Sequence, residues 1–350
     1  MTGGSIPDQD AVPAVRAAIR RWACLAREEG FLGSGELAVG VSGGPDSLAL
    51  AAGAVYVGRQ IGLRVHGLVV DHGLQPGSSD VAEHAAEVLR ELGLATARVL
   101  TVVVDGPGGM EAAARRARYS ALRAALPAPD ALVLLGHTRD DQAETVLLGL
   151  GRGSGPRSIA GMRPLDPPWG RPLLDIPRRI TVAACARLGL RPWADPQNVD
   201  PRFTRVRLRT EVLPLLDEVL AGGLAGALAR TAAQLRDDGE ALDQWADRVL
   251  AESTVLPEPT AHGQLDVGGL DVARLTAVPP AVRRRVLRRW LLDGGVREIT
   301  DAQLRSTDDL VGSWHGQGGV WLPGGFVVER ARGRLTLDHA NHYANHRITD

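Results

Sequence analysis

The sequence predicts an α/β protein with a doubly wound parallel sheet, followed by a helical linker and a small C-terminal α+β domain. In the first part of the chain, strand-like and helix-like segments alternate at short spacing, and several of the strand-like segments are continuous apolar runs. Such runs are typical of parallel strands that helices cover on both faces. After about residue 219 the composition changes, and alanine-rich helical segments precede short strands.

The N-terminal elements follow from hydrophobic periodicity. After a polar segment at 1–10, which we expect to be disordered, an amphipathic helix is predicted at 14–27. Apolar runs predict strands at 37–41, 64–71, 97–104 and 131–135. Helical spacing of apolar residues predicts helices at 47–59, 79–92, 110–125 and 139–150. Ser78 or Ser79 is the expected N-cap of the second of these helices.

The later elements are punctuated by glycine and proline. The segment 151–175 is rich in both and predicts a long loop, which in a compact domain is usually functional. Helices are predicted at 177–188, 205–216, 221–250 (one or two helices) and 280–292, and a strand meander at 319–322, 325–330 and 333–337. We expect a tail and helix at 1–34, the sheet domain at 35–218, the helical and small α+β domain at 219–338, and a polar tail at 339–350.

Composition limits the classes of function. The formal net charge is −1, so any nucleic-acid surface must be a local patch. Only two cysteines are present, Cys24 and Cys185, and their separation excludes a Cys-x-x-Cys metal site and favours a reducing compartment. The N-terminus lacks a signal-peptide core, and no run of about 18 apolar residues exists. We therefore expect a cytoplasmic protein with no membrane partner, and the composition leaves a homodimer open.

The most informative motif follows the first predicted strand. It consists of the residues Ser42, Gly43, Gly44, Pro45, Asp46 and Ser47. A strand, a glycine-rich turn and a helix N-terminus bind phosphate, because unpaired backbone N–H groups and the helix dipole converge on the anion. An ordinary tight turn would need only the glycines, so the full string favours phosphate binding. The Gly-Lys-[Ser/Thr] end of a Walker A motif is absent, and Asp46 is placed to meet a Mg²⁺ ion carried by the phosphates.

A second motif follows the fourth predicted strand. His137, Asp141 and Glu144 are spaced i, i+4, i+7, which predicts that they share one face of a helix. This helix begins at the same edge of the sheet as the phosphate loop, where ligands bind on such folds. Two carboxylates and an imidazole suit magnesium-nucleotide binding, an amine nucleophile or proton transfer. Acids that only complement the helix dipole are the alternative, and Asp140 fits that description.

The Ser-Gly-Gly-x-Asp-Ser string resembles the PP-loop of the ATP pyrophosphatases, which have a Rossmann-like sheet and cleave ATP between its α and β phosphates. Within that superfamily, the string from Gly136 to Met162 resembles the signature of the tRNA(Ile)-lysidine synthetase family. Four shorter strings, at 70–74, 114–119, 193–198 and 205–214, resemble the same family in the same order. The resemblance covers most of residues 37–216, and beyond 220 it rests on layout alone.

The resemblance implies a carbon–nitrogen ligase that uses ATP and Mg²⁺. It would adenylate C2 of the wobble cytidine in an isoleucine tRNA with a CAU anticodon and release pyrophosphate. The ε-amine of free L-lysine would then displace AMP and give lysidine. Residues 35–218 would form the ATP-binding catalytic domain, and 219–338 would bind tRNA.

The resemblance also implies roles for individual residues. The Ser42–Ser47 loop would hold pyrophosphate, with Asp46 as the magnesium ligand and Asp71 and His72 near the nucleotide. The reaction centre would contain Asp46, Arg115, His137, Asp141 and Glu144. The expected substrate-binding residues are Arg118, Asp195, Asn198, Arg205, Arg207 and Arg209.

Several of these assignments have a purely structural alternative. Arg205, Arg207 and Arg209 could form a solvated helix face, and Asp195 and Asn198 could cap a turn. The sequence departs from the family at Val206, where an asparagine is common, and at Ser158, where a glycine is common. The basic helix near residues 281–289 is our candidate for tRNA phosphate contacts, and a solvated face is its alternative.

Two other functions compete with this interpretation. One is a different PP-loop tRNA-modifying enzyme, such as a thiolation enzyme, although sulfur carriers of that class need paired cysteines or a cluster. The other is a catalytically silent RNA-binding relative, which would not need the intact acidic and histidine motif positions.

Overall fold

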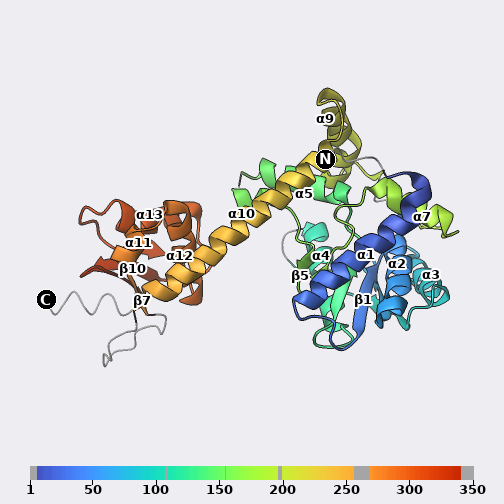
Figure 1. Cartoon of the computed structure of the whole chain (residues 1–350), viewed down its shortest axis with the longest axis horizontal. Coiled ribbons are helices and arrows are strands. Elements are labelled where there is room, and N and C mark those ends of the chain that lie inside the picture. The colour runs from blue at the N-terminus through green and yellow to red at the C-terminus, as the bar shows by residue number, and fades with distance from the viewer. Residues whose placement is uncertain (1–5, 107–108, 154, 196–198, 256–267, 340–350) are drawn as a thin grey trace. The chain divides into compact units, whose positions relative to one another are not determined.

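The structure is a computed structural model of the chain, and it describes residues 6–106, 109–153, 155–195, 199–255 and 268–339 (Figure 1). Contacts divide the chain into two compact units, 1–235 and 236–350, and we describe each unit by itself. The division falls within one long helix, α10 (Leu224–Ser253).

The sheet of the first unit positions the candidate site. It has the strand order β3-β2-β1-β4-β6-β5. Its strands are β1 (Glu36–Val41), β2 (Arg64–Asp71), β3 (Thr96–Thr101), β4 (Leu132–Leu135), β5 (Leu165–Asp166) and β6 (Trp169–Gly170). All neighbouring pairs are parallel except β5 with β6. The predicted parallel sheet is therefore confirmed, with an antiparallel edge strand added.

The helices of this unit match the predicted ones closely up to residue 151. They are α1 (Ala11–Glu28), α2 (Pro45–Ile61), α3 (Ser78–Glu91), α4 (Gly109–Ala124), α5 (Arg139–Gly151), α6 (Pro156–Ile159), α7 (Arg178–Arg187), α8 (Thr204–Arg207) and α9 (Leu213–Val219). Between α8 and α9 lies a π-helical turn, Leu208–Val212.

Three local predictions were wrong. The segment predicted as one long loop contains α6 and the β5–β6 hairpin. Strand β6 pairs with β4, and the hairpin thereby extends the sheet. Neither Ser78 nor Ser79 caps α3; its N-cap is Gly77, in the left-handed conformation. The predicted helix 205–216 is interrupted by the π-helical turn.

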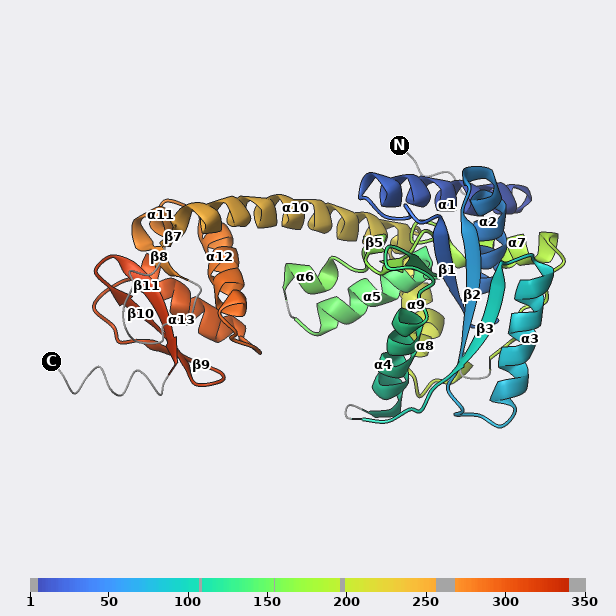
Figure 2. The same cartoon turned by 90° about the horizontal axis from the view of Figure 1, so that it is seen from below.

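Alternate residues of β1 face two different layers of helices. Leu37, Val39 and Val41 pack in a core with α1, α2, α3 and α7. Ala38 packs in a second core with Leu122 of α4. Figure 2 shows α3 and α4 on opposite sides of the strands. The sheet is thus covered on both faces, which explains why its strands are continuous apolar runs.

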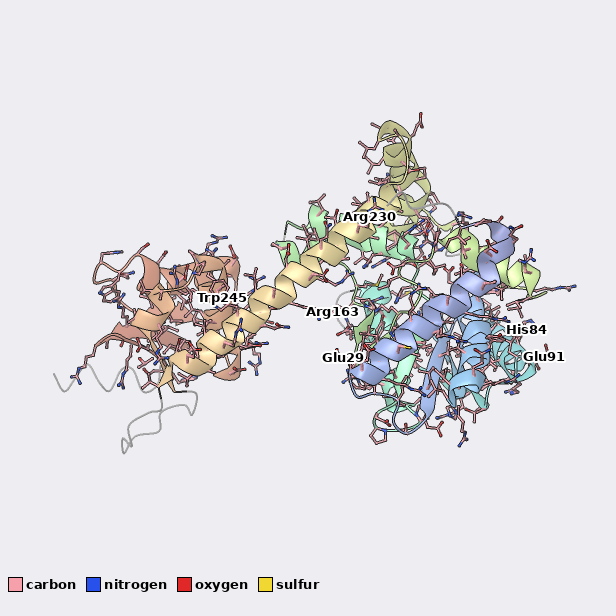
Figure 3. The ribbon with its side chains drawn as sticks, viewed as in Figure 1. Glu29, His84, Glu91, Arg163, Arg230 and Trp245 are labelled. Carbon is pink, nitrogen blue, oxygen red and sulfur yellow. The ribbon has the colours of Figure 1, made fainter. Side chains whose placement is uncertain are left out.

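Helix α3 shows how an amphipathic helix joins this layer. Its small residues Ala82, Ala85 and Ala86 are buried against the sheet. His84 is exposed, and it lies with Glu91 on the outer side of the helix (Figure 3).

The second unit is a small antiparallel sheet packed against helices. The sheet has the order β7-β8-β11-β10-β9. Its strands are β7 (Thr254–Val255), β8 (Gly269–Asp271), β9 (Val320–Leu322), β10 (Phe326–Ala331) and β11 (Arg334–His339), and its helices include α11 (Val272–Thr276), α12 (Pro280–Asp293) and α13 (Asp301–Gly312). The core surrounds Trp290 of α12, which is 2% exposed. The predicted meander and basic helix are confirmed as elements.

Most arginines of the basic helix α12 form ion pairs with acidic residues of the same unit. Arg283 is buried and makes a two-point ion pair with Asp308 of α13, Nε to Oδ1 at 2.5 Å and Nη2 to Oδ2 at 3.2 Å. Arg285 and Arg289 pair with Asp243 and Asp247 of α10. Three arginines of the candidate helix for tRNA phosphate contacts are therefore paired with acids of the same unit, and its contact with tRNA stays a prediction.

Within the described ranges, no single helix combines the length and hydropathy needed to cross a membrane. The stretches Thr204–Val219 and Leu224–Ser253 meet that requirement only when they are counted together, and they are bent by 93°.

Candidate active site

The phosphate loop lies where the sequence predicts it, between β1 and α2. Gly43 has a φ of 80°, a conformation that favours glycine, and the extended Gly44 caps α2. The first turn of α2 therefore presents its backbone N–H groups to the edge of the sheet. The Ser47 hydroxyl donates to Gly44 O at 2.9 Å and accepts from Ser42 N at 3.2 Å. Ser47 thus holds the loop in shape, while Ser42 remains exposed.

The loop borders a polar hollow of about 420 Å³. Gly136, directly after β4, lines this hollow. It packs closely on the phosphate loop, because an ideal Cβ there would lie only 3.0 Å from the carbonyl carbon of Asp46. The side chains that line the hollow include Asp46, Arg118, His137, Asp141, Arg178 and Arg209. The structure therefore brings both sequence motifs to one place.

Asp46 is held by two residues of α7. Thr181 hydrogen bonds to its Oδ1, and Arg178 Nε lies 3.0 Å from its Oδ2. Burial raises the pKa of Asp46, and the Arg178 charge and the Thr181 hydrogen bond oppose that effect. The first turn of α7 thus fixes the carboxylate in the phosphate loop.

His137 precedes α5 instead of lying on it, so the predicted i, i+4, i+7 face does not exist as a helix face. The helix begins at Arg139, and its N-cap is Thr138. Burial lowers the pKa of His137 to about 3, although Asp141 opposes that effect. Its buried Nδ1 has no hydrogen-bond partner among the described residues. The imidazole is therefore neutral at physiological pH and has an unused polar atom at the hollow.

Asp141 combines a structural and an electrostatic role. Its Oδ2 accepts from Thr138 N and Thr138 Oγ1, each at 2.8 Å, which completes a capping box. Its Oδ1 accepts from Arg178 Nη2 at 2.8 Å and lies 3.4 Å from Arg209 Nη2. Burial raises the pKa of Asp141, but the Arg178 charge, His137 and the Thr138 hydrogen bonds outweigh it, and the pKa lies below its ordinary value.

Glu144 lies behind the hollow and is not one of its lining residues. Its side chain is completely buried, and its Oε1 accepts from Arg209 Nε at 2.8 Å. Arg205 Nη1 lies 3.5 Å from its Oε2. Burial raises the pKa of Glu144, and Arg209 opposes that effect. Glu144 therefore anchors two arginines, and Arg209 reaches the hollow.

A second, more apolar hollow of about 330 Å³ shares Ser42 and Arg118 with the first. Its lining includes Val41, Val70, Asp71, His72, Met110, Trp193, Asp195 and Phe203. Burial lowers the pKa of His72, and Asp71 Oδ1 accepts from Gly73 N at 3.0 Å. An apolar hollow beside a polar one matches a nucleoside joined to phosphates, with Arg118 at the junction.

Other predicted site residues lie elsewhere. Arg115 is exposed and packs on Tyr119, donating to its hydroxyl at 3.1 Å. Arg207 is exposed and pairs with Glu211 at 3.0 Å, which is the solvated-face alternative. Neither residue lines either hollow. Asn198 lies outside the described residues.

The residues fit a magnesium ion that arrives with the nucleotide. Among the described residues, no three His, Cys, Asp or Glu side chains converge as a metal cage. Mg²⁺ commonly binds through one or two carboxylates and substrate phosphates, so it needs no such cage. Asp46 is the carboxylate beside the phosphate loop that would hold it.

Sequence reasoning missed Arg178 and Thr181. A signal existed in their spacing, because Arg178, Thr181 and Cys185 lie at i, i+3 and i+7, on one face of α7. All three contact the phosphate loop; the Cys185 thiol lies 3.2 Å from Pro45 O. Burial raises the pKa of Cys185 to about 11, so this thiol is inert.

Known proteins resemble this chain over both units. A PP-loop domain family matches residues 17–216, and a TilS substrate binding domain family matches residues 270–336. The tRNA(Ile)-lysidine synthase of Rhodococcus jostii is 54% identical over 337 residues, which cover 95% of this chain and 97% of that protein. The enzyme of the same name from Mycobacterium tuberculosis is 54% identical over 312 residues, or 89% of this chain and 91% of its own.

A solved structure shares the fold. The U34-tRNA thiolase NcsA from Methanococcus maripaludis, determined with its [4Fe-4S] cluster, aligns with a TM-score of 0.51 at 17% identity. The alignment covers 67% of this chain and 82% of the thiolase. This likeness supports the architecture of the sheet domain.

Proposed function

Because this chain belongs to the tRNA(Ile)-lysidine synthase family, we propose that it converts the wobble cytidine of a CAU-anticodon isoleucine tRNA to lysidine. The observation that carries the proposal is the pair of adjoining hollows, which share Ser42 and Arg118 and bring the phosphate loop to the His137 motif.

The nucleotide would lie across the two hollows. The apolar hollow with Trp193 and Phe203 accepts adenosine, and the phosphate loop holds the β and γ phosphates. Arg118 then lies beside the α phosphate. No carboxylate among the described residues pairs with Arg118, so its guanidinium is available to a phosphate. Mg²⁺ held by Asp46 would neutralise the leaving pyrophosphate.

The first step is adenylation of the tRNA. The C2 oxygen of the cytidine attacks the α phosphorus, the bond from that phosphorus to the β-phosphate oxygen breaks, and pyrophosphate leaves. Charge builds on the phosphoryl oxygens, and Arg118 and the α2 N-terminus stabilise it. His137 has a pKa of about 3, so it is too weakly basic to accept a proton at neutral pH. It serves instead as a hydrogen-bonding group for the cytosine ring.

The second step joins lysine to the tRNA. The neutral ε-amine of free lysine attacks C2, the C2–oxygen bond breaks, AMP leaves, and the nitrogen loses a proton. Asp141 is better placed than Glu144 to orient the amine, because Asp141 lines the hollow and Glu144 does not. The low pKa of Asp141 keeps it ionised, so it positions the amine electrostatically.

The remaining parts of the proposal concern the second unit and the cellular setting. The unit that matches the TilS substrate binding domain would bind the tRNA body. We place the enzyme in the cytoplasm, where ATP, lysine and tRNA are all present. A homodimer stays a prediction.

The test is pyrophosphate release from ATP with transcribed CAU isoleucine tRNA, with and without lysine, followed by nucleoside mass analysis. Lysine at the wobble cytidine is the expected result. Pyrophosphate release without lysine incorporation would mean that another nucleophile is used. No tRNA-dependent release would favour a silent RNA-binding relative.

A further inference from the structure

Arg178, which none of the sequence motifs includes, joins the two motifs through one side chain. Its Nε lies 3.0 Å from Asp46 Oδ2, and its Nη2 donates to Asp141 Oδ1 at 2.8 Å. The side chain is 23% exposed. A single guanidinium therefore spans the carboxylate of the phosphate loop and the carboxylate at the start of α5.

The backbone beneath this side chain is also fixed. Arg178 N donates to Asp140 Oδ2 at 2.8 Å, which ties the start of α7 to the start of α5. One turn later, the Thr181 hydroxyl lies 2.7 Å from Arg178 O and also contacts Asp46. The start of α7 is thus tied both to α5 and to the phosphate loop.

The charge arrangement explains why an arginine is required. Asp46 and Asp141 are both largely buried and carry like charges that repel each other in a medium of low polarity. Arg178 donates a hydrogen bond to Asp141 through Nη2, whereas its Nε faces Asp46 as a charge contact without a hydrogen bond. A guanidinium spreads its charge over three nitrogens of one planar group, so it can face two carboxylates at once. A lysine ammonium is a point charge on a flexible stem and cannot fix both carboxylates in this way.

We propose that Arg178 is a positioning residue for both steps of the reaction, because it sets the geometry of Asp46 and of Asp141 at once. This inference rests on the proposed function. Asp46 acts in pyrophosphate departure and Asp141 acts on the lysine amine, so loss of Arg178 slows the two steps together. A misplacement of about 1 Å can cost about 10²-fold in rate.

The experiment measures each step separately in four variants of the full chain. Pyrophosphate release without lysine reports adenylation. AMP release after lysine is added to preformed adenylated tRNA reports the second step. Arg178→Gln removes the bridge, and Arg178→Lys keeps its charge. Thr181→Val removes a hydroxyl that contacts Asp46 and Arg178 O but makes no contact with Asp141. Arg179→Gln is the matched control, since Arg179 is the next residue and pairs with Asp8 at 3.1 Å on the exposed side of the helix.

If Arg178 bridges Asp46 and Asp141, the four variants should differ in which step they slow. Arg178→Gln should lower kcat of both steps by about 10²-fold, with a smaller change in KM for ATP. Arg178→Lys should recover part of both rates, Thr181→Val should slow adenylation alone, and Arg179→Gln should behave as the wild type. Thermal unfolding of each variant separates these effects from loss of the fold, and Arg178→Lys keeps the test valid if Arg178→Gln does not fold.

Two results would overturn the inference. One is Arg178→Gln with slow adenylation and a wild-type second step, which would confine Arg178 to the phosphate loop. The other is equal loss of activity in the Gln and Lys variants with a lowered unfolding temperature, which would make the role structural only. A wild-type enzyme without activity would instead contradict the proposed function.

Discussion

Glu144 and Arg209 form a buried ion pair that connects α5 to the π-helical turn. Arg209 Nη2 lies 2.7 Å from Glu144 Oε1, and the glutamate side chain has no exposed surface. A π-helical turn widens the helix by one residue per turn and often marks a functional site. Here Arg209 lies on that turn and reaches both Glu144 and Asp141.

Glu144→Ala should destabilise the first unit and release Arg209. Removing one member of a buried ion pair leaves an uncompensated charge and costs about 3–5 kcal/mol. Denaturant unfolding of wild type and variant measures this loss. Glu144→Gln keeps the shape and one acceptor oxygen, so it should cost less; an equal cost in both variants would show that packing, and not the charge, explains the effect.

Gly136→Ala should impair ATP use without unfolding the protein. Its Cβ would lie 3.0 Å from the carbonyl carbon of Asp46 and 3.1 Å from Ser47 N, so the phosphate loop would have to shift. We expect about 10²-fold lower kcat/KM for ATP in the pyrophosphate-release assay. Gly151→Ala is the control, because nothing lies within 4 Å of the added atom. Equal effects at both positions would contradict this explanation.

Asp46→Ala should abolish pyrophosphate release and leave the fold intact, because Asp46 is the carboxylate proposed to meet the nucleotide-bound Mg²⁺. Steady-state assays across a Mg²⁺ titration would measure the loss. Normal release from this variant would remove Asp46 from the mechanism.

His137 should make stability depend on pH in the acid range. Its pKa is about 3 in the folded protein, below the ordinary value of 6.5, so between these values the unfolded chain binds more protons. The free energy of unfolding should therefore fall as pH decreases from about 6.5 towards 3. His137→Gln should flatten this dependence. Parallel wild-type and variant curves of unfolding free energy against pH would refute the assignment.

Arg283 and Arg288 of α12 should behave differently, although both belong to the same basic helix. Arg283→Ala breaks the buried pair with Asp308, so it should lower the stability of the second unit. Arg288 is half-buried, and the structure gives it no ion pair among the described residues. Arg288→Ala should preserve stability and reduce the salt slope of tRNA binding by about 1. An unchanged slope would assign Arg288 to a solvated face.

The sequence determined the first unit in outline because its signals are local. Apolar runs, helix periodicity and the glycine-rich turn after Val41 depend on neighbours a few residues apart, and the strands and helices up to 151 follow them closely. The phosphate loop and the His137 motif were also visible as short local strings. The structure brings them together, because β1 and β4 are adjacent and end at one edge of the sheet.

Only the tertiary structure decided how the charged groups pair. Each of these pairings joins segments that lie far apart in the chain. Glu144 anchors Arg209 instead of lining the site, and Arg283 meets Asp308 instead of solvent. Arg178 joins Asp46 to Asp141. A side chain's charge is written in the sequence. Tertiary packing decides which opposite charge lies next to a buried charged side chain. Such a partner is needed because burying a charge is costly unless an opposite charge lies within a few ångströms.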